Sequence, residues 1–413
     1  MQRLGLNSQG AFAAYLNALV NTHQRRIRLQ VLTREGKLIR SLTPYILDGQ
    51  VSVDSKQKDR ATRTCTMQIL DPTNSLGFEA DGLADMPLHQ KRMIRVGYEI
   101  FVDALGEWVN CWVFTGPIAD LKRTGAVVEL TAYGKEAMML GTTWIPRQFK
   151  KGVKKTRVIK ELFRDAGETR MSIPDLPAKL PAIFTVKKLD TRWAKAKKLA
   201  ASMDRQLFYD GRGVAILRHR PNKPVYAFDA ALLSDPEIGR PGEDFTNIWT
   251  VHGRKPKGAK KRVSASVTLP KAHSLSPHSL ARGGKLFYRG EVETNDAIRT
   301  KAEATARAKR MRDDGARLEV QFGFDALPIP ILDEGDLVRV RTRQDVWLVR
   351  MQQFTIPLGI ESEATMTVGA IKRSTAAVKR RKKTRKVGDG VSLVRRPPRV
   401  PAWSEQATRG WRG

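Results

Sequence analysis

Two segments far apart in this chain follow the same order of strands, turns and loops. Their strand-like runs are 93–96, 108–114 and 127–132 in the first segment, and 337–341, 346–351 and 364–368 in the second. In each segment a short basic strand precedes a turn, a strand that carries Trp, a loop that contains Pro117 or Pro357, and an alternating closing strand. Period-two alternation predicts strands with one buried face. A chain with two copies of one β-module can present a doubled symmetry when it oligomerises.

The length of 413 residues predicts two to four domains, and 41% hydrophobic residues supply enough apolar material for their cores. No apolar run reaches the roughly 18–20 residues of a membrane-spanning helix. The N-terminus reads as an amphipathic helix rather than a signal peptide. Cys65 and Cys111 each lie in a strand-like run. We expect both to be free thiols in a reducing cytosol. The alternative is a disulfide between them, which requires their strands to be neighbours.

The fold class that these patterns predict is mainly β with an α+β insertion. We expect an N-terminal helix or arm over 1–25, a first β-module over 26–141, a small α+β domain over 142–228, a second β-module over 229–372, and a basic tail over 373–413 that is disordered or ordered by a partner. Within the second module we expect a helix over 296–314 and an exposed, mobile basic loop over 254–284.

Local signals mark the ends of the expected helices. Ser8 is expected to cap the N-terminal helix, Thr156 and Asp190 the two helices of the α+β domain, and Asn295 or Asp296 the Ala-rich helix of the second module. The turn 210–213 predicts a hairpin between strands 206–209 and 214–217.

The net charge of +32 raises the possibility of nucleic-acid binding. Part of this charge lies in the C-terminal tail, and the rest is spread along the folded part, which promotes contact with any polyanion without specifying a site. The candidate contact residues for a polyanion or a partner are Lys379, Arg380, Arg381, Lys382, Lys383, Arg385, Lys386, Trp403 and Trp411. One interpretation of the basic run is that it neutralises phosphates. The other is that it is a solvated arm, or an arm that docks on an acidic protein. The two Trp residues would anchor a partner surface, or they belong to a simple disordered end.

No pattern in the chain indicates catalysis. The acidic run 333–336 lacks the alternating ligands and the distal Glu of an EF-hand, so we expect a solvated turn there. The six histidines are scattered, and zinc requires three or four ligands at close spacing. Hydrolase, phosphate-loop and dinucleotide signatures do not occur. We therefore expect a non-enzyme without a metal or a cofactor.

A series of short motifs follows a definite order along the chain: Gly49-x-Val51, Arg63-x-Cys65-x-Met67-x-Ile69-Leu70-Asp71-Pro72, Trp112-Val113-Phe114-Thr115-Gly116, Ala302 with Ala306-Arg307-Ala308, Pro330-Ile331-Leu332-x-x-Gly335-Asp336-Leu337-Val338-x-Val340, and Ile356-Pro357-Leu358. The order of these motifs resembles that of the tail hub, baseplate hub or minor tail proteins of tailed phages. The resemblance covers about residues 26–372. The run from Pro330 to Val340 is its most specific part.

This resemblance implies a homotrimer in which each subunit contributes two tail-tube-like β-barrel modules. Such a trimer would offer a pseudo-sixfold ring to the tail tube or distal tail ring, a threefold face to tip or fibre proteins, and a channel for the tape measure protein and DNA. It would be a virion protein of the tail tip, made in the host cytoplasm. After residue 373 the chain has no room for the hydrolase domain that some hub proteins append. The alternatives are a basic nucleic-acid-binding protein that uses the C-terminal arm and, more remotely, a cell-wall hydrolase.

Overall fold

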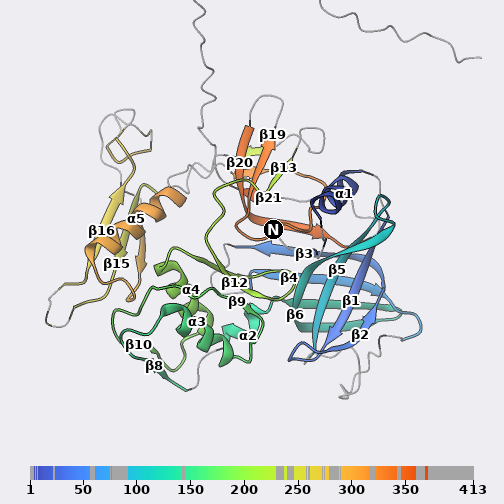
Figure 1. Cartoon of the computed structure of the whole chain (residues 1–413), viewed down its shortest axis with the longest axis horizontal. Helices are drawn as coiled ribbons and strands as arrows, with labels where there is room; N and C mark the ends of the chain where they lie inside the picture. Colours follow the sequence, from blue (N-terminus) through green and yellow to red (C-terminus); the bar gives the residue numbers. More distant parts are fainter. Residues whose placement is uncertain are drawn as a thin grey trace, which may run out of the picture. The chain divides into compact units, whose positions relative to one another are not determined.

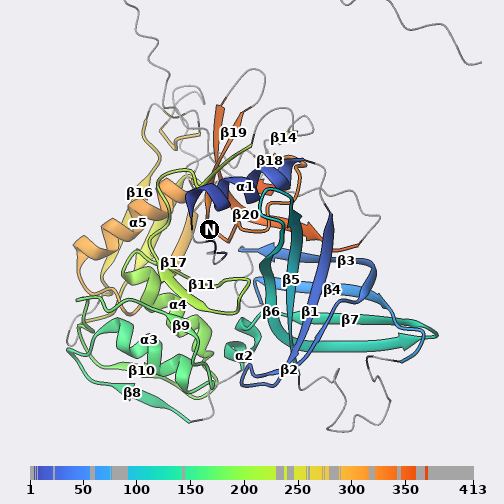
Figure 2. The same cartoon turned by 45° about the vertical axis from the view of Figure 1, so that its right-hand side comes forward.

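The structure is a computed structural model of the whole chain (Figure 1; Figure 2). It describes residues 4, 6, 8–21, 24–55, 61–74, 76, 92–141, 145–228, 237–239, 246–256, 258, 261–271, 273, 275–278, 288, 290–315, 321–341, 346–359 and 368–370. The fold is mainly β with a few helices, as the sequence predicts.

The first β-region begins with a helix that packs on its sheet. Helix α1 (Gln9–Val20) starts where expected, because Ser8 Oγ accepts a hydrogen bond from the N–H of Ala11 at 3.0 Å. Tyr15 and Leu19 of α1 are buried in the same apolar cluster as the strands. Those strands are β1 (Arg25–Leu32), β2 (Leu38–Leu42), β3 (Tyr45–Asp54), β4 (Arg63–Leu70), β5 (Met93–Val102), β6 (Glu107–Thr124) and β7 (Val127–Tyr133).

Strands β5, β6 and β7 form an antiparallel meander in which the long strand β6 changes partner along its length. Its first part, up to Pro117, pairs with β5, and its second part, from Ile118, pairs with β7. The expected loop at Pro117 is therefore wrong, because this proline lies inside a continuous strand. The strand tolerates it at the change of partner, where Ile118 N–H donates to Arg92 O at 3.0 Å.

The second near-repeat segment forms the same meander with shorter strands. Strand β20 (Val346–Pro357) pairs with β19 (Leu337–Arg341) through its first part, and with β21 (Val368–Ala370) through its second. Pro357 ends β20 rather than lying in a loop. Most of the expected closing strand 364–368 lies outside the described residues.

Hydrogen bonds join the two meanders through one pair of strands. The second part of β20 also pairs with β3, from Gln353 with Asp54 to Pro357 with Gln50. The continuous order is β14-β18-β21-β20-β3-β4-β7-β6-β5-β1-β2, where β14 is Glu237–Gly239 and β18 is Gln321–Gly323. Strand β13 (Tyr226–Phe228) pairs with β19 in parallel. One apolar cluster contains buried side chains from both meanders.

The α+β part has its own apolar cluster. Its elements are α2 (Glu136–Leu140), β8 (Arg147–Phe149), α3 (Lys155–Arg164), β9 (Met171–Ser172), β10 (Phe184–Val186), α4 (Arg192–Ser202), β11 (Gln206–Tyr209) and β12 (Ala215–Arg218). The predicted hairpin is confirmed by the pairing of β11 with β12. Two cap predictions are wrong, because α4 is capped by Thr191 instead of Asp190, and Thr156 lies inside α3.

A third apolar cluster lies between helix α5 (Lys301–Gly315) and strands β15 (Ile248–His252) and β16 (Ser264–Thr268); β17 (Gly290–Thr294) pairs with β15. The expected exposed loop over 254–284 is wrong in part, because β16 belongs to this sheet and Leu269 and Ser276 are buried. The sequence signal was missed because β16 alternates small side chains with Ser. The helix expected from 296 starts at Lys301, where Thr300 Oγ1 and Glu303 form a capping box instead of Asn295 or Asp296.

Candidate functional site

The acidic turn 333–336 is buried, so the expectation of a solvated turn is wrong. Asp333 and Asp336 are 2% and 0% exposed. The turn closes on itself, because Asp333 N–H donates to Asp336 Oδ2 at 3.0 Å. It also pairs with β20, because Gly335 N–H donates to Met351 O. Gly335 has a φ of +76°, and a Cβ there would lie 2.4 Å from Gln206 Oε1, so glycine is required for this close approach.

Two arginines from distant parts of the chain form ion pairs with the two aspartates of this turn. Arg63 of β4 lies 3.3 Å from Asp333 and donates to Val113 O at 2.5 Å. Arg218 of β12 donates to Asp336 Oδ1 at 2.8 Å and to Glu334 O at 2.9 Å. Gln206 Nε2 also donates to Glu334 O at 3.0 Å. We call the following group of residues the charged junction: Arg63, Gln206, Arg218, Asp333, Glu334 and Asp336. It ties the first meander's sheet, the α+β part and the second meander together.

The first β-region and the α+β part share a second buried ion pair. Lys135 forms an ion pair with Glu168, and both side chains are almost fully buried. Lys135 Nζ also donates to Gly213 O at 3.4 Å, and Thr115 Oγ1 donates to Gly211 O at 2.9 Å. The turn of the β11–β12 hairpin is thus held against the end of β7 and the middle of β6.

Burial shifts the ionisation of these groups. It raises the pKa of Asp333 to about 6, against the opposing effect of the Arg63 guanidinium. Burial also raises the pKa of Glu136, whose carboxylate accepts a hydrogen bond from Thr62 Oγ1 at 2.5 Å. It lowers the pKa of Lys135, while Glu168 acts in the opposite direction. In each case burial disfavours the charged form, and the opposing effect of a partner group applies only while that partner stays in place.

The two cysteines are free and buried, which confirms the thiol interpretation over the disulfide. Burial raises the pKa of both thiols well above the ordinary range. Cys111 Sγ donates to Pro330 O at 3.3 Å. Thiols of this kind are inert packing groups rather than nucleophiles.

Within the described part of the chain, no cluster of three or more His, Cys, Asp and Glu side chains could hold a metal ion. In the same residues, no helix is both long enough and apolar enough to cross a membrane.

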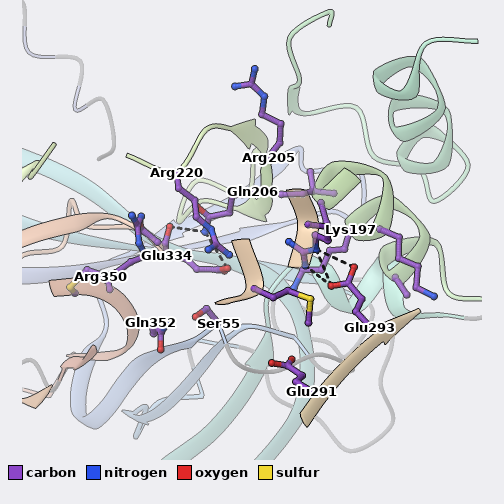
Figure 3. Close-up of a pocket in the computed structure, with 18 of the residues that line it drawn as sticks. Ser55, Lys197, Arg205, Gln206, Arg220, Glu291, Glu293, Glu334, Arg350 and Gln352 are labelled. Carbon is purple, nitrogen blue, oxygen red and sulfur yellow. Dashed lines mark hydrogen bonds and ion pairs between the residues drawn. The ribbon is translucent and has the colours of Figure 1, made fainter. Parts of the chain in front are cut away.

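An open cavity of about 720 Å³ lies next to the charged junction (Figure 3). Its walls come from α4, β11, β17, α5, the turn at Glu334 and the start of the second part of β20. In Figure 3, Glu291 and Glu293 of β17 lie on one side, and Glu334 and Arg350 lie on the other. Glu293 is paired with Arg307 of α5 at 2.6 Å.

Sequence reasoning placed the contact residues in the tail, and these all lie outside the described residues: Lys379, Arg380, Arg381, Lys382, Lys383, Arg385, Lys386, Trp403 and Trp411. It missed the charged junction, although one signal was present. In the alternating run of β4, Arg63 is in phase with the buried residues Cys65, Met67 and Ile69. An arginine on a buried face requires a buried acidic partner.

No protein-family model matches the chain, and no curated protein sequence matches it. Its structure is similar to that of the 43 kDa tail protein of prophage MuSo2 from Shewanella oneidensis, with a TM-score of 0.57 and 13% identity over 85% of this chain and 99% of that chain. It is also similar to the tail protein from Neisseria meningitidis, with a TM-score of 0.55 and 12% identity over 84% of this chain and 96% of that one. Because sequence identity is low, the likeness lies in the fold. The chain therefore has the fold of these tail proteins.

Proposed function

We propose that this protein is a structural component of a phage tail, and specifically a trimeric hub at its distal end. Two observations support the proposal. The fold is that of the tail proteins from Shewanella oneidensis and Neisseria meningitidis. The chain also carries two meanders of the same topology, β5–β6–β7 and β19–β20–β21, each built around one long strand that changes partner.

The repeated meander is the observation that supports the proposal of a trimer. Three chains with two equivalent modules each would form a ring of six, which matches the symmetry of a hexameric tail tube or distal tail ring. The opposite side of the same trimer has threefold symmetry, which suits tip or fibre proteins. In this arrangement the ring encloses a channel for the tape measure protein and then for DNA.

The proposal includes a division of labour along the chain. The modules over 26–141 and 229–372 form the ring, the α+β part over 142–228 braces them, and the tail over 373–413 contacts a partner. The role is structural rather than enzymatic, and the place is the virion's tail tip after synthesis in the host cytoplasm. The charged junction supports the bracing role, because Arg218 fixes the α+β part to the acidic turn 333–336 that precedes β19, and Arg63 of β4 fixes the same turn to the first sheet.

The mass of the purified protein in solution tests the trimer. Light scattering should give three times the chain mass of 46.3 kDa for the protein alone, or a heavier complex with three copies of this chain when the tube protein is present. A chain that ends at residue 373 should keep the same fold and assembly. An image of the intact tail should then place six β-modules in one ring.

A different result would favour the nucleic-acid alternative. A stable monomer that binds DNA tightly, with an affinity that collapses between low and moderate salt, would contradict the hub. Loss of that binding on removal of 374–413 would assign it to the basic tail.

A further inference from the structure

The strand β17 presents an open edge to the cavity. It pairs with β15 on one side, and no other described strand pairs with it. Four consecutive residues, 291–294, line the cavity. Because neighbouring side chains of a strand point to opposite faces, a run of four lining residues indicates that the strand's edge faces the cavity.

The free backbone groups on this edge can be assigned. Asn295 N–H donates to His252 O of β15 at 2.8 Å. Backbone N–H groups alternate sides along a strand, so those of Val292 and Thr294 point away from β15. The side chain of Val292 is 61% exposed. An open edge of this length is a ready template for another extended chain.

The other walls of the cavity are polar and carry an excess of positive charge. Lys197 and Lys198 of α4 line it, and within the described residues neither forms an ion pair. Lys197 Nζ lies 5.2 Å from the centre of the Trp193 ring. Arg205 stands at the rim and points away from Glu334 in Figure 3. Of the β17 carboxylates, Glu293 is already neutralised by Arg307.

We propose that this cavity binds an extended, acidic segment of a partner protein, which adds to β17 as a fourth strand of the β16–β15–β17 sheet. Main-chain hydrogen bonds to Val292 and Thr294 give the affinity, and Lys197 and Lys198 select acidic side chains. Four paired residues span about 13 Å, which a cavity of about 720 Å³ accommodates. The inference does not depend on a trimer, because every wall of the cavity belongs to one chain.

The test uses the full chain and a labelled peptide of seven residues in which Glu alternates with Thr or Val. Val292→Pro removes the free N–H without breaking a ladder bond, because proline is tolerated where the N–H of an edge strand faces outward. Val292→Thr keeps the N–H and serves as the matched control. We expect Val292→Pro to weaken binding by at least about tenfold in fluorescence anisotropy, and Val292→Thr to bind like the original chain.

Charge is tested on both partners. Lys198→Glu should weaken binding of the acidic peptide. It should strengthen binding of a second peptide in which Lys replaces every Glu. Circular dichroism and the melting temperature of each variant verify that the sheet is intact. The proposal is overturned if the acidic peptide does not bind at millimolar concentration, if Val292→Pro binds it unchanged while folded, or if a single-stranded oligonucleotide binds better and ignores Val292→Pro.

Discussion

The two meanders share a topology and differ in how far each supplies its own core. In the first, β5 has ten residues, all of which pair with β6, and eight of them, residues 93–100, also pair with β1. In the second, β19 has five residues and its other neighbour is the three-residue strand β13. The Trp residues differ as well. Trp347 is buried, whereas Trp108 is half-buried under the guanidinium of Arg26 at 4.1 Å.

This difference shows that a repeated topology does not imply a repeated source of stability. Strands β19 and β21 of the second meander are short, and the meander is joined to the first region by the β3–β20 pairing and by the Arg63–Asp333 ion pair. The second meander should therefore depend on the first more than the reverse.

The largest expected effect comes from breaking the charged junction. Arg63→Met leaves Asp333 buried without its cation, and we expect a loss of about 3–5 kcal/mol in the free energy of unfolding. Chemical denaturation measures this loss. Arg28→Met, at a half-exposed arginine on β1, is the control and should cost far less. If Arg63→Met costs no more than its control, the two meanders do not rely on the junction. The double variant Arg63→Met/Asp333→Leu should recover part of the loss, because it removes both members of the ion pair and leaves no unpaired buried charge at this position.

A matched pair of core substitutions tests whether the meanders unfold together. Phe114 of β6 and Phe354 of β20 are both fully buried on the long strands. Each change to Leu should cost about 1–2 kcal/mol and lower the midpoint of the same single transition. Calorimetry would reveal a second transition if the meanders were independent. A change that moves only one of two transitions would contradict a shared core.

The pKa of Asp333 gives a pH dependence with a definite sign. Because burial raises its pKa to about 6 in the folded chain, the folded state holds a proton that the unfolded state releases between about pH 4 and 6. Its contribution to stability is fully present below pH 4 and is lost as the pH rises through 6. Asp333→Asn should remove this slope from a plot of stability against pH. An unchanged slope in the variant would mean that another group titrates in this window.

The smallest expected effect lies on the outer face of the first meander. Arg26 is 44% exposed, and it covers Trp108 and pairs with Glu99 at 2.6 Å. Since Arg28 also reaches Glu99, Arg26→Ala should cost less than about 1 kcal/mol. The emission of Trp108 should shift toward longer wavelength. If the shift is absent while stability falls sharply, Arg26 has a role in the core that its exposure does not suggest.

Much of the local structure could be predicted from the residues alone. The alternation of apolar and polar residues predicted β1 and β4. The spacing of apolar residues and the cap at Ser8 predicted α1, and the turn at Asp210 predicted the β11–β12 hairpin. The errors fall where local signals compete. Asp190 and Asn295 are good caps by composition, but Thr191 and Thr300 hold the positions from which a side chain reaches the first free N–H groups.

The sequence by itself determined that the chain is mainly β and that it contains one β-pattern twice, because alternation is a local property of strands. Only the tertiary structure decided that the acidic turn 333–336 is buried and that both meanders share one sheet. The ion pair between Arg63 and Asp333 joins residues 270 positions apart. Whether a carboxylate is solvated or paired depends on what packs against it, and no local pattern of residues specifies that neighbour.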